Sequence, residues 1–402
     1  MTAVLRAYRQ AYAGLPPRVW MLAGVMLVSR CGTMFLPFMA IYLTAESGYT
    51  PRQAGGMLAV YGIGAVLGTY CGGVLCQRLS PLRVIVGGLL LGVPGFLVLP
   101  YCRSPESLVA ALLYLSIVRE SVRPALGTAT SDFSPIEMHS KAFALNRLAL
   151  NLGMSIGAGV SGLLAAASYQ AMFAFNALVA IVAALLLLSV FDVKDHQPHA
   201  ASEASVAARG PGPWSDSVFL VFLVLQMAAG LVFFQLIGTL PMYWEEVCGI
   251  GERGVGVLFM VNTLLIVAFE MLVADRLRGF RPLPIVGAGM GLVCLGFGGS
   301  VLESWGVLGG GLTLAIALVL VWTAGEMLSA PFTMAFVASR SAGPSRAAYM
   351  GLNAASLSTA QVAAPLIGTW LYQADPSLLW WCSLAMAVTL PVAFAVLSTA
   401  DR

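Results

Sequence analysis

Three charged residues stand inside an apolar run that extends from Leu108 to Ala129. Arg119 and Arg123 are four residues apart and Glu120 comes three before Arg123, so on a helix the three side chains share one face. A charge at the centre of a membrane helix costs roughly 2.5 to 3.5 kcal/mol on insertion scales, and such residues usually serve a proton, an ion or a charged ligand. We therefore predict that this polar stripe faces a cavity and not lipid.

Three further charges lie within apolar runs: Arg30, Glu270 and Glu326. Glu326 has no basic residue within one turn on its own run, and a carboxyl in apolar surroundings can take up and release a proton near neutral pH. We predict that Glu326 carries protons or contacts a cationic substrate, with Arg119, Glu120 and Glu270 assisting in proton coupling. An alternative role for Glu270 is to lock a gate, and the alternative for the whole set is structural ion pairing between helices.

A substrate site is predicted beside these carboxyls, because polar and aromatic residues fall within the apolar runs. The predicted substrate-binding residues are Arg30, Arg123, Phe234, Gln235, Asn262, Trp322 and Asn353. A mostly apolar pocket with a few polar groups is typical of sites for drug-sized organic molecules. We therefore expect a small amphipathic substrate.

The elements that must position these residues are membrane helices. The chain has 402 residues, of which 59% are hydrophobic and 10% charged, against about 25% charged in a soluble domain. A membrane-spanning helix needs about 20 apolar residues. The runs that meet this need cover approximately 19–44, 52–76, 82–102, 106–131, 141–167, 169–191, 216–243, 252–275, 282–302, 304–334, 346–372 and 377–398. We predict an all-α membrane protein with twelve transmembrane helices.

Lysine and arginine fall mainly on one side of the predicted membrane, and this sets the orientation. With both termini inside, only Arg52, Arg103 and Arg253 fall in outer loops, while the other loop and terminal Lys and Arg residues are cytoplasmic. The formal net charge of +3 is therefore a topology signal and does not indicate nucleic-acid binding. We expect a multi-pass protein of the lipid bilayer with both termini in the cytoplasm.

The chain is predicted to consist of two related six-helix halves. The predicted parts are a cytoplasmic N-terminal segment 1–18, an N-terminal half 19–191, a cytoplasmic linker 192–215 and a C-terminal half 216–402. A shift of 207 residues places Pro124 on Pro331 and Asn146 on Asn353. Two pseudo-symmetric halves around a central substrate site are typical of secondary transporters.

The repeat also relates the two charged positions of greatest interest. In the same register Glu326 falls on Arg119, so equivalent mid-helix positions carry opposite charges. We predict that the charged cluster of the fourth run acts as the counter-charge that tunes the Glu326 carboxyl.

The loop after the second run carries a motif. The stretch Gly73-Val74-Leu75-Cys76-Gln77-Arg78, with Arg83 beyond it, resembles the loop between helices 2 and 3 of the major facilitator superfamily, usually G-x-L-x-D-R. Gln77 stands where the family has Asp, while Asp275-Arg276 keeps the acidic and basic pair after the eighth run. The resemblance implies gating loops that contain Gly73, Gln77, Arg78, Arg83, Asp275 and Arg276.

Two membrane runs strengthen this resemblance. Arg119 resembles the helix 4 arginine of the superfamily, and Gly153-x-x-x-Gly157-Ala158-x-x-x-Gly162 resembles the helix 5 motif of its antiporters, with Ala158 in place of proline. Together with Gly325-Glu326 ahead of Pro331, the likeness is greatest to bacterial multidrug exporters of the drug:proton antiporter-1 type. It covers nearly the whole chain.

The resemblance implies a secondary active transporter of the bacterial inner membrane that works by alternating access. Its expected activity is export of small amphipathic organic molecules in exchange for protons, by a functional monomer. No enzymatic activity, metal or cofactor is expected beyond the proton gradient. The sequence also has no Walker A motif, so we do not expect ATP as the direct energy source.

Two alternatives stay open on the sequence. Among the charges within runs, the first half holds three Arg and one Glu and the second half holds two Glu, so a zwitterionic metabolite or peptide-like substrate could lie along that dipole. The E-x-x-E-R signature of proton-coupled peptide transporters is absent from the first run. A non-transporting receptor built on a transporter fold is the alternative from another class.

Overall fold

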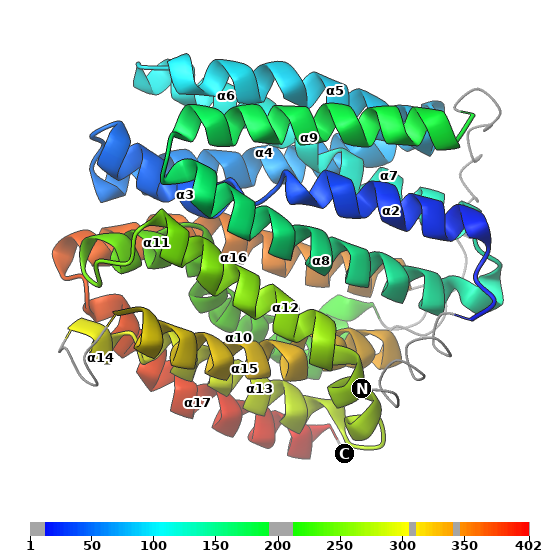
Figure 1. The fold of residues 1–402 in the computed structure, drawn as a ribbon. Helices are drawn as coiled ribbons and strands as arrows, with labels where there is room; N and C mark the ends of the chain where they lie inside the picture. Colours follow the sequence, from blue (N-terminus) through cyan, green and yellow to red (C-terminus); the bar gives the residue numbers. More distant parts are fainter. Residues whose placement is uncertain (1–12, 193–211, 305–310, 341–345, 402) are drawn as a thin grey trace. The chain divides into compact units, whose positions relative to one another are not determined.

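A computed structural model of the protein describes residues 13–192, 212–304, 311–340 and 346–401. Every regular element in these ranges is helical (Figure 1). The expectation of an all-α protein is confirmed. Most of the predicted N-terminal segment 1–18 and of the predicted linker 192–215 lies outside the described residues.

The predicted N-terminal half contains eight described α-helices. They are α2 (Pro17–Cys31), α3 (Leu36–Ile41), α4 (Pro51–Arg78), α5 (Pro81–Val98), α6 (Pro105–Glu120), α7 (Val122–Asp132), α8 (His139–Ala165) and α9 (Tyr169–Val190). A π-helix, Tyr42–Glu46, continues α3, and two short 3-10 helices cover Leu99–Tyr101 and Ile136–Met138. Two of the predicted runs are therefore interrupted, the first after Cys31 and the fourth at Ser121.

The predicted C-terminal half contains eight further α-helices within the described ranges. They are α10 (Ser217–Phe233), α11 (Thr239–Glu246), α12 (Glu252–Leu277), α13 (Pro282–Gly298), α14 (Val301–Ser304), α15 (Gly311–Arg340), α16 (Arg346–Ala374) and α17 (Leu378–Ala400). Short 3-10 helices cover Pro213–Ser215 and Phe234–Ile237. The run predicted at 304–334 is displaced, since α15 begins at Gly311 and continues to Arg340.

Several helices begin at side chains that cap their first turn. The side chains of Ser80, Ser104, Ser168 and Asp216 each accept a hydrogen bond from the backbone N–H three residues later. The cap supplies a partner for an N–H group that has none within the helix. These residues fix where α5, α6, α9 and α10 enter the bundle.

Ten helices or continuous helical stretches of the described chain are long and apolar enough to cross a membrane. The predicted runs 106–131 and 346–372 are not among them. The first is divided between α6 and α7 and carries Arg119, Glu120 and Arg123, while the second, α16, mixes polar residues with its apolar ones. Both runs differ from the prediction at places where polar residues stand among the apolar residues of a helix.

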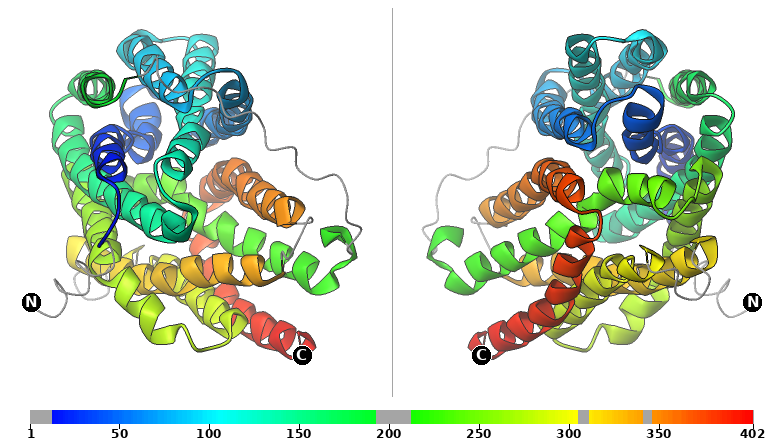
Figure 2. Two further views of the ribbon diagram at one scale, coloured as in Figure 1. Left: turned by 90° about the vertical axis from the view of Figure 1, so that its right-hand side faces the viewer. Right: turned by 90° about the vertical axis from the view of Figure 1, so that its left-hand side faces the viewer.

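The described helices form two compact units, and the first unit is built around α2, α5, α8 and α9. Helices α2 and α8 lie side by side in Figure 1 and in both views of Figure 2. Gly153 of α8 makes this possible, since a Cβ there would overlap the Leu27 carbonyl of α2. In the same unit Gly68 of α4 lies against the backbone of Ile117 of α6, so these two helices pack closely at this glycine.

The second unit places α13 between α15 and α17, with α12 on α15 and α10 on α16. It also contains Leu36–Gly62, which the sequence assigned to the half 19–191. Gly55 explains the assignment: a Cβ there would overlap the Thr369 side chain of α16 and approach the Pro365 carbonyl. Glycine therefore lets the start of α4 pack directly on α16.

Candidate functional site

The carboxyl group of Glu326 is held between two membrane helices of the second unit. Asn262 of α12 donates from Nδ2 to Glu326 Oε2 of α15 at 3.0 Å. The same Nδ2 donates to Thr323 Oγ1 of α15 at 3.0 Å. Because the Thr323 hydroxyl donates its own proton to the Val319 carbonyl, its oxygen can only accept from Asn262. This network fixes the orientation of the amide and presents both of its N–H groups to α15.

The other face of α15 packs on α13, and this packing positions α15 for the contact with Asn262. Gly325 of α15 lies against Gly289 of α13, where a Cβ on either residue would meet the backbone of the other helix. Such close approach requires glycine and leaves the adjacent Glu326 turned toward a different neighbour. The half-buried Glu326 carboxyl and the buried Asn262 amide thus meet at the α12 to α15 contact.

An aromatic cluster adjoins this polar network. Trp322, one residue before Thr323, is 3% exposed and lies 4.3 Å from Phe297 of α13, measured between ring centroids. Trp244 of α11 stands edge-on to Trp322 and to Phe259 of α12, with centroids 6.3 and 6.0 Å away. Trp322 is therefore part of the packed core beside the carboxyl site. We define the Glu326 site as Glu326, Asn262, Thr323 and Trp322.

Gln235 belongs to a different part of the second unit. Its amide nitrogen donates to the Ala364 carbonyl of α16 at 3.0 Å and to the Leu231 carbonyl at 2.9 Å, and its Oε1 accepts from Thr239 Oγ1 at 2.7 Å. With 1% of its surface exposed, the side chain bridges the break between α10 and α11 to α16. Its hydrogen bonds are used within the protein, which favours a structural role over direct substrate contact.

Phe234 and Asn353 lie on either side of the α10 to α16 contact. Phe234 caps the end of α10 and is half-buried beside Gly230, with its ring edge-on to Phe233. Asn353 of α16 is 4% exposed, and its Oδ1 has no hydrogen-bond partner within the described part of the chain. The structure therefore brings Asn262 to Glu326, while Phe234 and Gln235 lie along the α10 to α16 contact and Asn353 lies on α16.

The charged cluster of the fourth run is divided by the helix break at Ser121. Arg119, at the end of α6, is 9% exposed and stacks over the Phe96 ring of α5 at 5.6 Å from the centroid. Glu120 and Arg123 lie 4.0 Å apart across the break, with 21% and 64% of their side chains exposed. The three groups thus have different surroundings, and Arg119 packs against α5.

The remaining predicted charges and the helix 5 motif also have defined places. Arg30 lies in the last turn of α2, where its Cβ contacts α8 at Gly153, and Glu270 lies half-buried in α12. A Cβ on Gly157 would overlap the Cys31 carbonyl, so the predicted motif forms the close contact of α8 with α2. Gly162 is buried near the end of α8 and its carbonyl accepts the N–H of Ala166.

The predicted gating loops lie at helix ends. Gly73, Gln77 and Arg78 are in the last turns of α4, and Gln77 and Arg78 are exposed. The backbone N–H of Arg83 donates to the Ser80 side chain at the start of α5. Asp275 and Arg276 are exposed at the end of α12, where the Asp275 carbonyl accepts the N–H of Arg278. Their role in gating stays a prediction.

A cavity of about 680 Å³ lies in the first unit, beside α7 and the start of α8. Its lining consists of Pro124, Gly127, Thr128, Ser131, Asp132, Ser134, Pro135, His139 and Phe143. The hydroxyls of Thr128 and Ser131 donate to carbonyls one turn earlier in α7, so their lone pairs are left for a ligand. The pocket is open to its surroundings and does not enclose a ligand-sized space.

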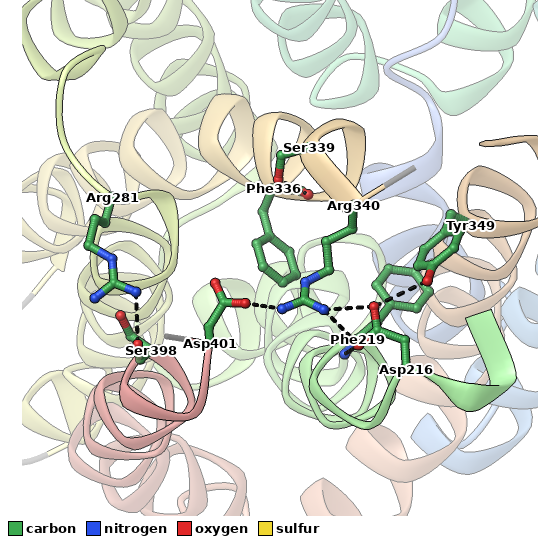
Figure 3. Close-up of polar contacts among 9 residues, drawn as sticks. All are labelled: Asp216, Phe219, Arg281, Phe336, Ser339, Arg340, Tyr349, Ser398 and Asp401. Atoms are coloured by element: carbon green, nitrogen blue, oxygen red, sulfur yellow. Dashed lines mark hydrogen bonds and ion pairs between the residues drawn. The ribbon is translucent and has the colours of Figure 1, made fainter. Parts of the chain in front are cut away.

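An ion-pair network joins four helices at the end of the second unit that lies next to the predicted linker. We call this end of the unit the linker end. The network was not predicted from the sequence. Arg340, the last residue of α15, donates to both carboxylate oxygens of Asp216 at 2.7 Å and pairs with Asp401 (Figure 3). Tyr349 of α16 donates its hydroxyl to Asp216 at 3.1 Å. The sequence contains one signal for part of this network: Asp216 stands directly before an apolar run, and an Asp in that position predicts a helix cap.

The same contacts change the titration of Asp216, which precedes the α10 membrane span. Burial acts to raise the pKa of this carboxyl, but the hydrogen bonds from Arg340 and from the Phe219 N–H outweigh burial and hold the pKa below its usual range. Asp216 is therefore ionised at neutral pH and ties α10 to α15 and α16.

Comparison with known proteins assigns the chain to a family. The sequence profile described as Major Facilitator Superfamily matches residues 21–333, which is well over half of the chain. The chain belongs to the major facilitator superfamily. This confirms the superfamily resemblance, and members of this family are transporters and not enzymes.

Similar proteins give this major facilitator transporter a broad context. The uncharacterized MFS-type transporter YttB of Bacillus subtilis (strain 168) is 25% identical over 253 residues, which are 62% of this chain and 62% of that protein. The multidrug resistance protein MdtG of Dickeya zeae (strain Ech586) is 26% identical over 148 residues, 36% of this chain and 35% of that protein. The chain thus spans less than two thirds of the length of both relatives.

The solved structures support the fold of this superfamily member. A POT family transporter in complex with 5-aminolevulinic acid covers 97% of this chain, and this chain covers 97% of that one, with a TM-score of 0.81 and 14% identity. At this identity the likeness concerns the fold alone. The expectation of an all-α membrane protein with the major facilitator fold is confirmed.

Proposed function

We propose that this major facilitator transporter exports small amphipathic organic molecules in exchange for protons by alternating access. The Glu326 site carries the proposal. Its carboxyl lies half-buried in the middle of a membrane helix, with the amide of Asn262 as a neutral donor. Ionisable groups within membrane helices typically mark proton relays and substrate pathways.

The chemistry of the Glu326 site suits proton exchange. A hydrogen bond to the ionised carboxylate from Asn262 stabilises the charged form, while the apolar surroundings favour the neutral form. These two opposed effects allow a carboxyl to change its protonation within a transport cycle. A substrate that carries positive charge would compete with the proton for the same carboxylate, which is the elementary step of an exchanger.

Two further observations support an organic substrate. The open pocket in the first unit has a mixed lining of hydroxyl, carboxyl, imidazole and phenyl groups, which are groups that contact organic ligands. The partial likeness to the multidrug resistance protein MdtG is consistent with efflux of such compounds. Both observations concern the class of substrate, and neither one indicates which ion drives transport.

The experiment has two stages. A thermal-shift screen of the purified protein against a chemically diverse set of cationic, neutral and zwitterionic compounds identifies ligands. Proteoliposomes are then loaded with the best ligand, and efflux is followed with and without an imposed pH gradient. The proposal predicts that the gradient accelerates transport of a cationic or neutral amphipathic ligand. Efflux that responds to a sodium gradient, and not to a pH gradient, would contradict it.

The zwitterion alternative rests on the distribution of charge between the two halves of the sequence. Arg30, Arg119 and Arg123 lie in the first half, whereas Glu270 and Glu326 lie in the second. Competition between zwitterionic, cationic and neutral compounds for a bound fluorescent ligand separates the two proposals. Displacement by zwitterions alone would favour a metabolite or peptide-like substrate over multidrug export.

A further inference from the structure

A second buried carboxyl lies in the second unit at the end opposite the linker end, which we call the far end. Glu303 belongs to the short helix α14 and is 6% exposed. Its Oε2 accepts a hydrogen bond from the Cys248 thiol, with Sγ at 3.3 Å. Its Oε1 is buried and has no hydrogen-bond partner within the described part of the chain. One oxygen of the Glu303 carboxyl is therefore hydrogen-bonded to the Cys248 thiol, and the other oxygen has no partner in the described chain.

The loop between α11 and α12 brings Cys248 to this carboxyl. Gly249 adopts a φ of +65°, which favours glycine, and the loop folds back so that the N–H of Cys248 bonds to the Tyr243 carbonyl. Burial, together with the Glu303 carboxyl, raises the pKa of the Cys248 thiol. The thiol therefore keeps its proton at neutral pH and is the donor in the contact with Glu303.

The groups around Glu303 are neutral or acidic. The Tyr243 hydroxyl of α11 donates to the Ser300 carbonyl at 2.8 Å, and the Tyr372 hydroxyl of α16 donates to Glu246 of α11 at 2.7 Å. Burial, Glu246 and Glu252 of α12 raise the pKa of Glu245.

No ion pair joins Glu303 to an Arg or Lys within the described ranges of the chain. Arg253, in the first turn of α12, makes no ion pair with Glu303 among the residues that the structure describes. The stretch 305–310 that follows α14 contains no charged residue in the sequence. The donors that act on the Glu303 carboxyl are thus the Cys248 thiol and the Ser300 side chain, which are both neutral, and the carboxyl has no counter-ion in the described chain.

We propose that Glu303 is a proton-binding site at the far end, in which the Cys248 thiol holds one carboxyl oxygen and a proton occupies the other. A buried carboxylate without a counter-ion is unfavourable, whereas the neutral acid with hydrogen bonds from neutral donors is not. The ligand is a proton taken from solution. Glu303 is separate from the Glu326 site, and only the use of its proton in transport depends on the proposed function.

Proton binding at Glu303 can be measured without transport. The full-length protein in lipid nanodiscs is titrated from about pH 5 to about pH 9, and infrared difference spectra record the C=O stretch of protonated carboxyls. The expected result is a band that titrates in the unsubstituted protein and is absent from Glu303→Gln. Glu46→Gln, which changes an exposed carboxyl, is the matched control and should keep the band.

Two substitutions of Cys248 test the thiol in opposite directions. Cys248→Ala removes the donor to the carboxylate, so the titration midpoint of the Glu303 band should rise by about one pH unit. Cys248→Ser supplies a stronger donor and should lower the midpoint. A purely structural thiol would leave the midpoint unchanged in both variants.

The outcomes separate this proposal from the proposed function. A Glu303→Gln protein that folds and shows the same titrating bands as the unsubstituted protein would overturn the proton site. If Glu303→Gln does not fold, the S–H stretch of Cys248 in the unsubstituted protein decides, and a band that stays fixed over the whole titration would overturn it. Neither result affects pH-driven transport through the Glu326 site.

Discussion

Asn262 Nδ2 lies 3.0 Å from Glu326 Oε2 and so joins α12 to the carboxyl group of α15. The same nitrogen donates to Thr323, whose hydroxyl proton is committed to its own helix. The amide therefore has one possible orientation, and its carbonyl oxygen points away from α15. In the proposed exchanger, this contact sets how readily Glu326 gives up its proton.

Asn262→Leu should move the pH dependence of transport. The substitution keeps the size of the side chain but removes the donor that stabilises ionised Glu326, so the carboxyl holds its proton to higher pH. We expect the transport profile to shift upward by about one pH unit. The measurement is the initial rate of ligand efflux from proteoliposomes over a series of pH values.

The control for Asn262→Leu is Thr323→Val, which removes the other acceptor of the amide and leaves the Asn262 to Glu326 bond in place. Its profile should shift less than that of Asn262→Leu. Equal shifts in both variants, or none in either, would show that the direct amide contact does not tune the carboxyl.

Gly368→Ala should destabilise the contact between α16 and the break after α10. A Cβ at Gly368 would overlap Gln235 Oε1 and Thr239 Oγ1, both of which are buried and hydrogen-bonded to one another. Overpacking of this kind costs about 1 to 3 kcal/mol. The unfolding temperature in detergent should fall, while Gly351→Ala, where a Cβ would meet no atom within 4 Å, should leave it unchanged. A stable Gly368→Ala protein would mean that the Gln235 contact is easily rearranged.

Asp216→Asn should make stability less dependent on pH. The pKa of Asp216 is lower in the folded protein than in the unfolded chain, so the carboxylate contributes stability above the unfolded pKa of about 3.9 and loses it as the pH falls through the lower folded value. At pH 7 the variant should lose about 2 kcal/mol from the charge-assisted pair with Arg340, because Asn still accepts the Phe219 N–H and keeps the cap. The measurement is chemical unfolding at several pH values.

The contrast with the unsubstituted protein should shrink as the pH falls below about 4 and disappear only below the lower folded pKa, where Asp216 is protonated in both states. Asp375→Asn, at an exposed carboxyl outside the Arg340 network, is the comparison and should have a much smaller effect at pH 7. A stability difference that persists unchanged at acid pH would assign the effect of Asp216→Asn to packing and not to charge.

The sequence was sufficient for ten of the twelve predicted membrane helices, because their signal is composition over some twenty residues. It was less informative where a helix breaks. The interruption at Ser121 and the 3-10 turn at Phe234–Ile237 occur inside predicted runs, and each lies at a tertiary contact, of Gly72 with Ser121 and of Gln235 with α16. Such contacts join residues far apart in the chain, so no local pattern reveals them.

In the candidate site, too, the sequence indicated the residues but not the contacts between them. Glu326 could be identified because a lone carboxyl in an apolar run is conspicuous, and Asn262 because it is polar within a membrane helix. Their contact spans 64 residues and depends on the glycine pair Gly325 and Gly289, which sets the rotation of α15. Gln235 looked equally promising in the sequence, but its partners are backbone carbonyls. Residue type indicated the candidates, and only tertiary packing separated them.

The comparison of unsubstituted protein with Glu326→Gln in proteoliposomes tests the central claim most directly. Ligand exchange at equal pH on both sides reports binding and alternating access, whereas accumulation driven by a pH gradient reports coupling. We predict that Glu326→Gln retains exchange but loses gradient-driven accumulation, while Glu106→Gln, at an exposed carboxyl, retains both. Gradient-driven accumulation by Glu326→Gln at the level of the unsubstituted protein would contradict the assignment of proton coupling to Glu326.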